Sequence, residues 1–197
     1  REERKRNAED WKAAQEERRK QRAAERRTWL DDLRRKSLPL DERAAQNRRL
    51  LLGLSLSGED REDLVSRGLT EKDIAKVGFR SASKNQELSH KVSPRLAGVT
   101  RDGRRIYVSG DGYLCPHTDY DGRILGFQVR LRGVSDAKYR WLKSGNSSHL
   151  PNGELPLSVA RGENPHKIIL VEGSLKGVVA AKKWNAMTVA AAGGNFS

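Results

Sequence analysis

The sequence predicts an α+β architecture that leads into an α/β unit, with charged helices at the N-terminal end. Three observations support this fold class. Residues 1–36 contain no Gly or Pro and are rich in Ala, Glu, Arg, Lys and Gln, which favour a helix. Short β-rich runs separated by Asp-Gly turns begin near residue 104 and are typical of a small antiparallel sheet. Residues 167–197 then show the pattern of a strand, a helix and a second strand.

The composition indicates a polyanionic partner. The chain has 197 residues, a formal net charge of +13 and a pI near 10.2, which favour nucleic acid first and an anionic membrane surface second. No apolar run reaches the length of a transmembrane helix, and no signal peptide opens the sequence, so we expect a soluble, cytoplasmic protein without membrane contact. The single cysteine, Cys115, excludes an internal disulfide and fits a reducing compartment.

Residues 1–36 are expected to form one long helix. They carry fourteen basic and nine acidic residues, a difference of five, with opposite charges at four-residue spacing such as Glu16 and Lys20. The large apolar side chains are few: Trp11, Trp29, Leu30 and Leu33. Since this helix has so little to bury, it should project from the core. Either a nucleic-acid-binding arm or a solvated spacer helix fits this pattern.

Two shorter helices should follow Pro39. The first spans residues 41–52 and ends at Gly53. The second spans residues 58–67, with Ser57 as its N-cap and with Leu64 and Val65 facing inward.

A third short helix is predicted from a capping box. Thr70 and Asp73 have the required spacing, and Gly78 is placed to end the helix. Together with the preceding helix this resembles a helix-turn-helix. The second helix, EKDIAKV, is short and begins with acidic residues, which favours a packing role over DNA reading.

Four strands are predicted in the central region: Arg105–Ser109, Tyr113–Asp119, Arg123–Leu131 and Lys138–Ser144. Asp111-Gly112 and Asp121-Gly122 separate the first three, and Asp-Gly is a strong hairpin signal, so a small antiparallel meander is expected. Cys115 and His117 have no second ligand pair nearby, which argues against zinc, and Cys115 should be a small buried strand residue.

Basic residues concentrate on the last two of these strands. Alternation puts Arg130 and Arg132 on one face of their strand, and Lys138 and Arg140 on one face of the next. We expect these four cations, with Lys143 nearby, to share a surface that binds phosphates while aromatic residues stack on bases. A sheet with a solvated basic face and an aromatic core is the alternative.

Near the C-terminal end, one carboxylate stands where a strand turns into a helix. Ile168–Val171 are aliphatic, as in a strand buried on both faces of a parallel sheet, and Glu172-Gly173 end it. Ser174 can cap the following helix, and Met187–Ala191 form the next strand.

The carboxyl ends of these two strands should share one rim. Glu172 and the turn at Gly193-Gly194 would then lie together. On spacing alone, Glu172 is either a solvated acid that complements the helix dipole or a ligand for magnesium.

The order of these motifs resembles a known family. GYLCPHTDYDGRILGFQVRL, KYRWLKS, a Leu-Pro-Leu segment at 155–157, IILVEGSLKGVVAA and AAAGG are similar to the catalytic core of DnaG-type primases, which includes a TOPRIM domain. The upstream stretch LSGEDREDLVSRGLTEKDIAKVGFRS resembles the primase-like TOPRIM domains of plasmid, phage and cyanobacterial replication proteins. The resemblance covers residues 55–197 and omits the long charged helix.

The resemblance implies roles for individual residues. Glu172 matches the TOPRIM glutamate, a general base or metal-associated acid in nucleotidyl transfer, and Gly173 is the glycine that follows it. Arg130 and Lys138 match residues that contact nucleotide or template. Lys176 departs from the Asp of many primases, which favours a phosphate contact there. The resemblance also implies Mg²⁺ or Mn²⁺, single-stranded DNA and nucleoside triphosphates, and a replicative helicase as partner.

The second metal motif of this family is not found before Ser197. TOPRIM chemistry needs Asp-x-Asp opposite the glutamate, so the chain is expected to be a fragment with an incomplete site. The expected divisions are a charged helical extension at 1–54, a small helical segment at 55–100, a basic antiparallel sheet at 101–165 and a partial TOPRIM domain at 166–197. A non-catalytic nucleic-acid-binding module, or another TOPRIM enzyme such as a topoisomerase or nuclease, are the alternatives to a primase.

Overall fold

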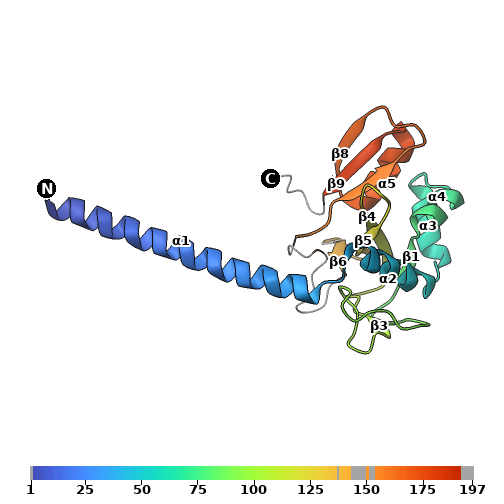
Figure 1. The fold of residues 1–197 in the computed structure, drawn as a ribbon. Helices are drawn as coiled ribbons and strands as arrows, with labels where there is room; N and C mark the ends of the chain where they lie inside the picture. The colour runs from blue at the N-terminus through green and yellow to red at the C-terminus, as the bar shows by residue number, and fades with distance from the viewer. Residues whose placement is uncertain (1, 137, 143–149, 151–153, 192–197) are drawn as a thin grey trace.

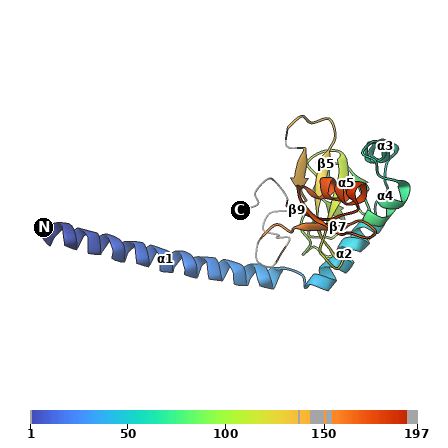
Figure 2. The same ribbon diagram turned by 90° about the horizontal axis from the view of Figure 1, so that it is seen from above.

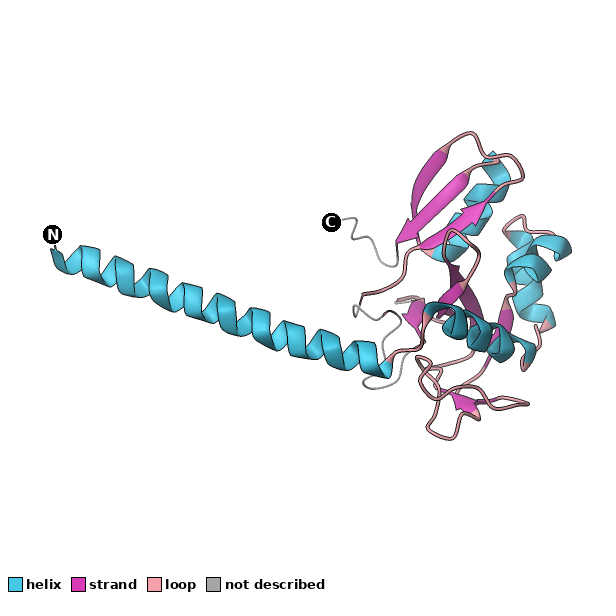
Figure 3. Cartoon of the chain, in the orientation of Figure 1, coloured by secondary structure: helices cyan, strands magenta, loops and turns pink. Residues whose placement is uncertain are grey.

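The computed structural model describes residues 2–136, 138–142, 150 and 154–191 (Figure 1). Figure 3 shows how its helices and strands are distributed. In chain order they are α1 (Glu2–Lys36), α2 (Leu40–Leu52), α3 (Gly58–Ser66), α4 (Glu71–Val77), β1 (Arg80–Ala82), β2 (Gln86–Glu87), β3 (Arg105–Ile106), β4 (Gly112–Thr118), β5 (Ile124–Leu131), β6 (Tyr139–Trp141), β7 (Ser158–Arg161), β8 (Ile168–Glu172), α5 (Ser174–Trp184) and β9 (Met187–Ala191).

The long helix α1 projects from the rest of the molecule, as its composition predicts (Figures 1 and 2). The expected pair of Glu16 and Lys20 forms, with 3.2 Å between the carboxylate and the ammonium. Its last turns are anchored, because Leu33 is buried and the Arg95 guanidinium donates to the carbonyl of Lys36 at 3.1 Å. No helix in the described ranges is both long enough and apolar enough to cross a membrane, and α1 itself is strongly polar.

A four-stranded antiparallel sheet with the order β1-β4-β5-β6 forms the centre of the fold. The hairpin between β4 and β5 turns at Asp121-Gly122 as predicted, and Gly122 has a φ of +77°. The hairpin expected at Asp111-Gly112 is wrong, because β3 pairs with β2 instead of β4. β1, β2 and β7 are short and were missing from the predicted set.

Both faces of this sheet are covered. Cross-strand partners share a face, so Leu114 and its partner Val129 lie on one side, where they pack with Leu50 of α2. The Asn47 side chain of α2 also donates to the carbonyl of Ile124 at 2.8 Å. The other face packs against α3, α4 and α5, and its apolar cluster consists of Leu64, Leu69, Ile74, Phe79, Tyr113, Cys115 and Leu175. Helix α2 therefore packs on the sheet, unlike α1.

Helices α3 and α4 follow their predicted caps. The Ser57 hydroxyl accepts from the Asp60 amide, and Thr70 with Asp73 forms the complete capping box. Leu64 is fully buried, but the inward position predicted for Val65 is wrong, because its side chain is 47% exposed. Consecutive helical residues point about 100° apart, so this short helix presents only one of the two to the sheet.

The C-terminal strand–helix–strand unit is confirmed: β8 and β9 are parallel and α5 connects them. The order of this second sheet is β7-β9-β8, with β7 antiparallel to β9. The expected burial of β8 on both faces is wrong, since Ile168 is 63% and Leu170 65% exposed. β8 is an edge strand here, and α5 covers one face of the sheet. Ser174 is also not the N-cap, because Gly173 holds that position and no side chain caps the helix.

Candidate functional site

Glu172 lies at the carboxyl end of β8, level with Ala191 at the end of β9. The turn that follows depends on Gly173, whose φ of +79° is unfavourable for other residues. The Gly173 amide donates to the Ala191 carbonyl at 2.7 Å and so fixes the two strand ends side by side. The Glu172 side chain is 56% exposed. The carboxyl ends of the two strands therefore share one edge, as predicted, and its carboxylate is accessible to solvent and ligands.

Lys176 is the described neighbour of this carboxylate. It lies one turn into α5, and its Nζ is 3.0 Å from Oε2 of Glu172, while its own side chain is 63% exposed. The pair brings an ammonium to the same edge, where it can meet a phosphate. Since both groups are exposed, the pair itself adds little stability.

The residues that the structure describes do not complete a metal site. No group of three or more His, Cys, Asp or Glu side chains capable of holding a metal ion occurs among them. Glu172 supplies one carboxylate, and that carboxylate already contacts an ammonium. Magnesium usually takes one or two carboxylates and completes its shell with water and phosphate. The predicted Gly193-Gly194 turn and Lys143 lie outside the described residues.

The Glu172 turn is docked on the same sheet face as Arg130. Leu175, three residues after Glu172, is buried in one cluster with Tyr113, which is the cross-strand partner of Arg130. The hydroxyl of Thr118 on β4 also donates to the carbonyl of Val159 on β7 at 2.8 Å, which links the two sheets. The candidate catalytic edge and the arginine-bearing strand thus belong to one packed unit.

The predicted surface of four cations is wrong. In the observed register Arg130 pairs with Tyr139, whereas Arg140 pairs with Val129. Arg130 and Arg132 therefore lie on one face, and Lys138 and Arg140 on the other. Sequence alternation gave the correct face within each strand, but the relative register of the two strands could not be read from it.

Arg130 and Arg132 are instead held by acidic residues of α3. Nη1 of Arg130 is 3.6 Å from Oδ2 of Asp63, and its side chain is 17% exposed. Arg132 pairs with Glu59, and its Nε is 3.4 Å from the buried carboxylate of Asp60. Sequence reasoning missed this partnership because about seventy residues separate the partners. The acidic run GEDRED in α3 was the available signal.

Asp63 is the centre of this polar cluster. Its carboxylate accepts from Nε and Nη2 of Arg67, at 2.9 and 3.1 Å, and from the Tyr113 hydroxyl at 2.8 Å. Partial burial raises the pKa of Asp63, but the hydrogen bonds from Arg67 and Tyr113 and the charge of Arg130 outweigh it, so the pKa is lowered. Burial raises the pKa of Tyr113, and the hydrogen bond that its hydroxyl donates to the Asp63 carboxylate acts in the same direction. Asp63 is therefore ionised and Tyr113 neutral at pH 7.

Arg140 on the edge strand β6, and Lys138 immediately before that strand, are both exposed. Lys138 continues the β5–β6 ladder, because its carbonyl accepts from the Leu131 amide at 2.8 Å. These side chains, with Lys176, are the exposed cations among the described candidate residues.

Cys115 is confirmed as a buried strand residue, and burial raises the pKa of its thiol to about 12, which makes it unreactive.

A separate groove of about 710 Å³ lies between α2, α4, α5, the β4–β5 turn and β7. Its apolar floor includes Leu51, Val77 and Val178, and Arg161 on its wall stacks on Tyr120 at 3.6 Å from the ring centre. Arg161 aligns with Met187, at the start of β9, whereas Glu172 aligns with the end of that strand. The groove is therefore at the opposite end of the small sheet from the candidate catalytic edge.

Comparison with known proteins finds similarity among solved structures only. No family model and no curated protein matches the chain. It is similar to a DnaG catalytic core, with 20% identity and a TM-score of 0.49 over 84% of this chain and 54% of that one. It is similar to a DnaG primase catalytic domain bound to single-stranded DNA, with 20% identity and a TM-score of 0.47 over 86% of this chain and 57% of that one. It is also similar to a DNA primase domain from Pseudomonas aeruginosa, with 24% identity and a TM-score of 0.46 over 66% of this chain and 45% of that one. The chain thus spans about half the length of these solved structures.

Proposed function

We propose that this chain is part of a primase-type nucleotidyltransferase that makes short RNA primers on single-stranded DNA, in a plasmid or phage type of replication. The observation that carries the proposal is the position of Glu172. An exposed carboxylate at the end of a parallel strand, level with the end of its neighbour, lies where α/β folds bind and transform their ligands. The ordered motifs from Tyr113 to Gly194 support the same assignment.

In this proposal Glu172 acts on the attacking 3′-hydroxyl. A carboxylate at this edge can accept the proton of the hydroxyl or orient it toward the incoming triphosphate. Lys176, one turn further on, places a positive charge where the triphosphate would lie. Primer synthesis of this type takes Mg²⁺ or Mn²⁺, to which Glu172 would supply one carboxylate. No group of three or more His, Cys, Asp or Glu side chains that could hold such an ion occurs among the described residues.

The exposed cations of the edge strand would guide the template. Arg140 on β6 and Lys138 immediately before it are solvent-exposed, and we assign them, with Lys143, to phosphate contacts. Arg130 and Arg132 form ion pairs with Asp63 and Glu59 of α3, which would fix the position of their strand. The exposed part of each arginine side chain would contact the nucleotide. Binding of single strands should weaken steeply with salt, with a slope of about −0.7 per phosphate contact.

The test is primer synthesis by the full-length protein that contains this chain, with a matched pair of variants. Glu172→Gln should lower the rate by roughly 10²- to 10⁴-fold, the usual contribution of a general base. Glu163→Gln is the control, because Glu163 is an exposed acid in the loop before β8, at the other end of the sheet. Equal rates for Glu172→Gln and the unchanged protein would refute the catalytic assignment.

A second candidate is a binding module without catalysis. No metal-holding cluster occurs among the described residues, and the Glu172 carboxylate contacts the Lys176 ammonium. Both observations favour a binding module over a topoisomerase or nuclease. It predicts salt-dependent binding of single strands and no primer synthesis by the full-length protein at any concentration of Mg²⁺ or Mn²⁺.

A further inference from the structure

Two tryptophans on α1 are unusually exposed. Trp11 is 62% and Trp29 51% exposed, although Trp is usually buried over most of its surface. Their separation is 29 − 11 = 18 residues, which is about five turns at 3.6 residues per turn. Both rings therefore lie on the same face of α1, about 27 Å apart at 1.5 Å per residue.

The same face is basic between the tryptophans. At about 100° per residue, Arg18 and Arg22 lie within about 20° of the line that joins Trp11 and Trp29. We call Trp11, Arg18, Arg22 and Trp29 the Trp–Arg stripe. Within about 60° of this line, Glu25 is the one acidic residue between the tryptophans, a segment that the structure describes in full.

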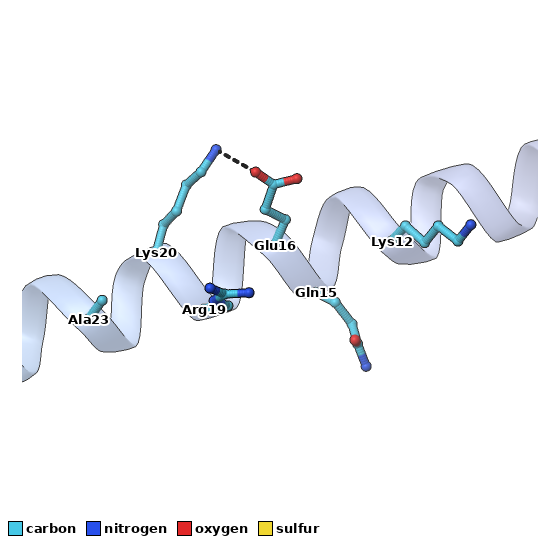
Figure 4. Close-up of a pocket in the computed structure, with 6 residues that line it drawn as sticks. All are labelled: Lys12, Gln15, Glu16, Arg19, Lys20 and Ala23. Atoms are coloured by element: carbon cyan, nitrogen blue, oxygen red, sulfur yellow. Dashed lines mark ion pairs between the residues drawn. The ribbon is translucent and has the colours of Figure 1, made fainter.

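The acids of α1 lie mostly on other faces. Figure 4 shows that Gln15, which flanks the Trp–Arg stripe, points away from the side on which Glu16 pairs with Lys20. The six residues drawn there belong to a single helix with no opposite wall, so they do not enclose a ligand site. The pairing of charges on that side contrasts with the excess of arginine on the stripe.

The charges of the stripe disfavour a second copy of this chain as its occupant. Antiparallel pairing that stacks Trp11 on Trp29 of a partner would place Arg18 against Arg22, and parallel pairing would place each arginine against itself. The stripe also lacks the apolar residues at seven-residue repeats that a coiled coil requires. Flat aromatic faces with cations between them suit a chain of bases and phosphates.

We propose that the Trp–Arg stripe binds single-stranded nucleic acid, with bases stacked on Trp11 and Trp29 and phosphates held by Arg18 and Arg22. At about 3.4 Å per phosphate of a stacked strand, the 27 Å stripe corresponds to about eight nucleotides. The site shares its partner with the proposed function but needs no catalytic residue. It lies on the projecting helix, away from the Glu172 edge (Figure 1).

The experiment measures binding of labelled oligothymidylates to the chain at several salt concentrations. Trp11→Ala and Trp29→Ala should each weaken binding roughly 5- to 150-fold, the range for loss of one stacked base. The pair Arg18→Gln and Arg22→Gln should lower the salt slope by about 1.4, since each lost phosphate contact removes about 0.7. An oligomer much shorter than about eight nucleotides can reach only one of the two tryptophans, so one of the two tryptophan variants should bind it as tightly as the unchanged chain does.

The matched control is the pair Lys20→Gln and Arg27→Gln, which removes the same charge from the opposite face of the same helix. Gln has nearly the helix propensity of Lys and Arg, so all these variants should keep α1 intact, as circular dichroism would verify. The stripe would be refuted as a binding site if the two pairs of charge variants lowered the salt slope equally, or if both tryptophan variants bound with unchanged affinity. If the full-length protein makes no primers while stripe-dependent binding persists, the proposed function fails and the stripe stands. If the full-length protein makes primers while the stripe variants bind as well as the unchanged chain, the stripe fails and the proposed function stands.

Discussion

Replacing Asp63 by Asn tests whether α3 is fixed to the sheet by charge. The change removes the negative charge that meets Arg67 and Arg130, and Asn cannot accept from Arg67 and Tyr113 as the carboxylate does. A hydrogen bond to a charged group contributes about 1.5–3 kcal/mol, and with Asp63 about a third exposed we expect a net loss near 2 kcal/mol. For a chain of this size that corresponds to a fall in melting temperature of roughly 4–8 °C.

The loss should also depend on pH in a defined direction. The folded-state pKa of Asp63 is lowered, so its contribution is complete above the unfolded-state value of about 3.9 and is lost as pH falls through the folded value. Urea unfolding of both proteins between pH 7 and pH 3 should therefore show the Asp63→Asn difference shrinking below about pH 4. Asp31→Asn, which breaks an exposed ion pair on α1, should change stability by less than about 0.5 kcal/mol. A difference that stays constant down to pH 3, or one no larger than that of Asp31→Asn, would refute the reasoning.

The remaining predictions concern the interior of the central sheet. Burial lowers the pKa of His117 to about 4, against the opposing effect of a hydrogen bond with Gln128, so stability should fall by about 3 kcal/mol as pH drops from about 6.5 to about 4. His117→Gln should make the free energy of unfolding less dependent on pH between about 6.5 and about 4. If denaturant titrations of the variant at several pH values show the same pH dependence as the unchanged protein, His117 is excluded as its source. A Cβ added at Gly112 would overlap the carbonyl oxygen of Arg130, so Gly112→Ala should cost at least about 1–3 kcal/mol. Gly58→Ala, which adds a Cβ into open space, is the control, and equal melting midpoints for the two would disprove the clash.

Local signals in the sequence were sufficient for most elements. The capping box at Thr70 and Asp73, the turn at Asp121-Gly122 and the strand–helix–strand unit depend on residues within a few positions of one another. Glu172 was placed correctly for the same reason, because the end of an aliphatic run followed by Glu-Gly fixes a strand end without reference to the rest of the fold. Exposure of β8 was not predictable in this way, since it depends on which strands flank it in the sheet.

Register and long-range charge pairing were beyond these signals. A one-residue change in the pairing of β5 with β6 moves every side chain of β6 to the other face, and the sequence carries no turn motif that fixes it. The pairing of Arg130 with Asp63 and of Arg132 with Glu59 likewise depends on how α3 docks. These contacts arise from tertiary packing, which short-range patterns do not encode.

The ion pairs change what the net charge of +13 means for binding. Arg67, Arg130 and Arg132 are counted in that total, but each lies against a carboxylate of α3, so their attraction for a phosphate is partly cancelled. Exposed cations without such neighbours in the described structure, such as Arg18, Arg22 and Lys138, keep their full effect. Affinity for single strands should therefore follow the location of the cations more closely than their number, so neutralising Arg18 and Arg22 should reduce the salt dependence more than neutralising Arg130 and Arg132.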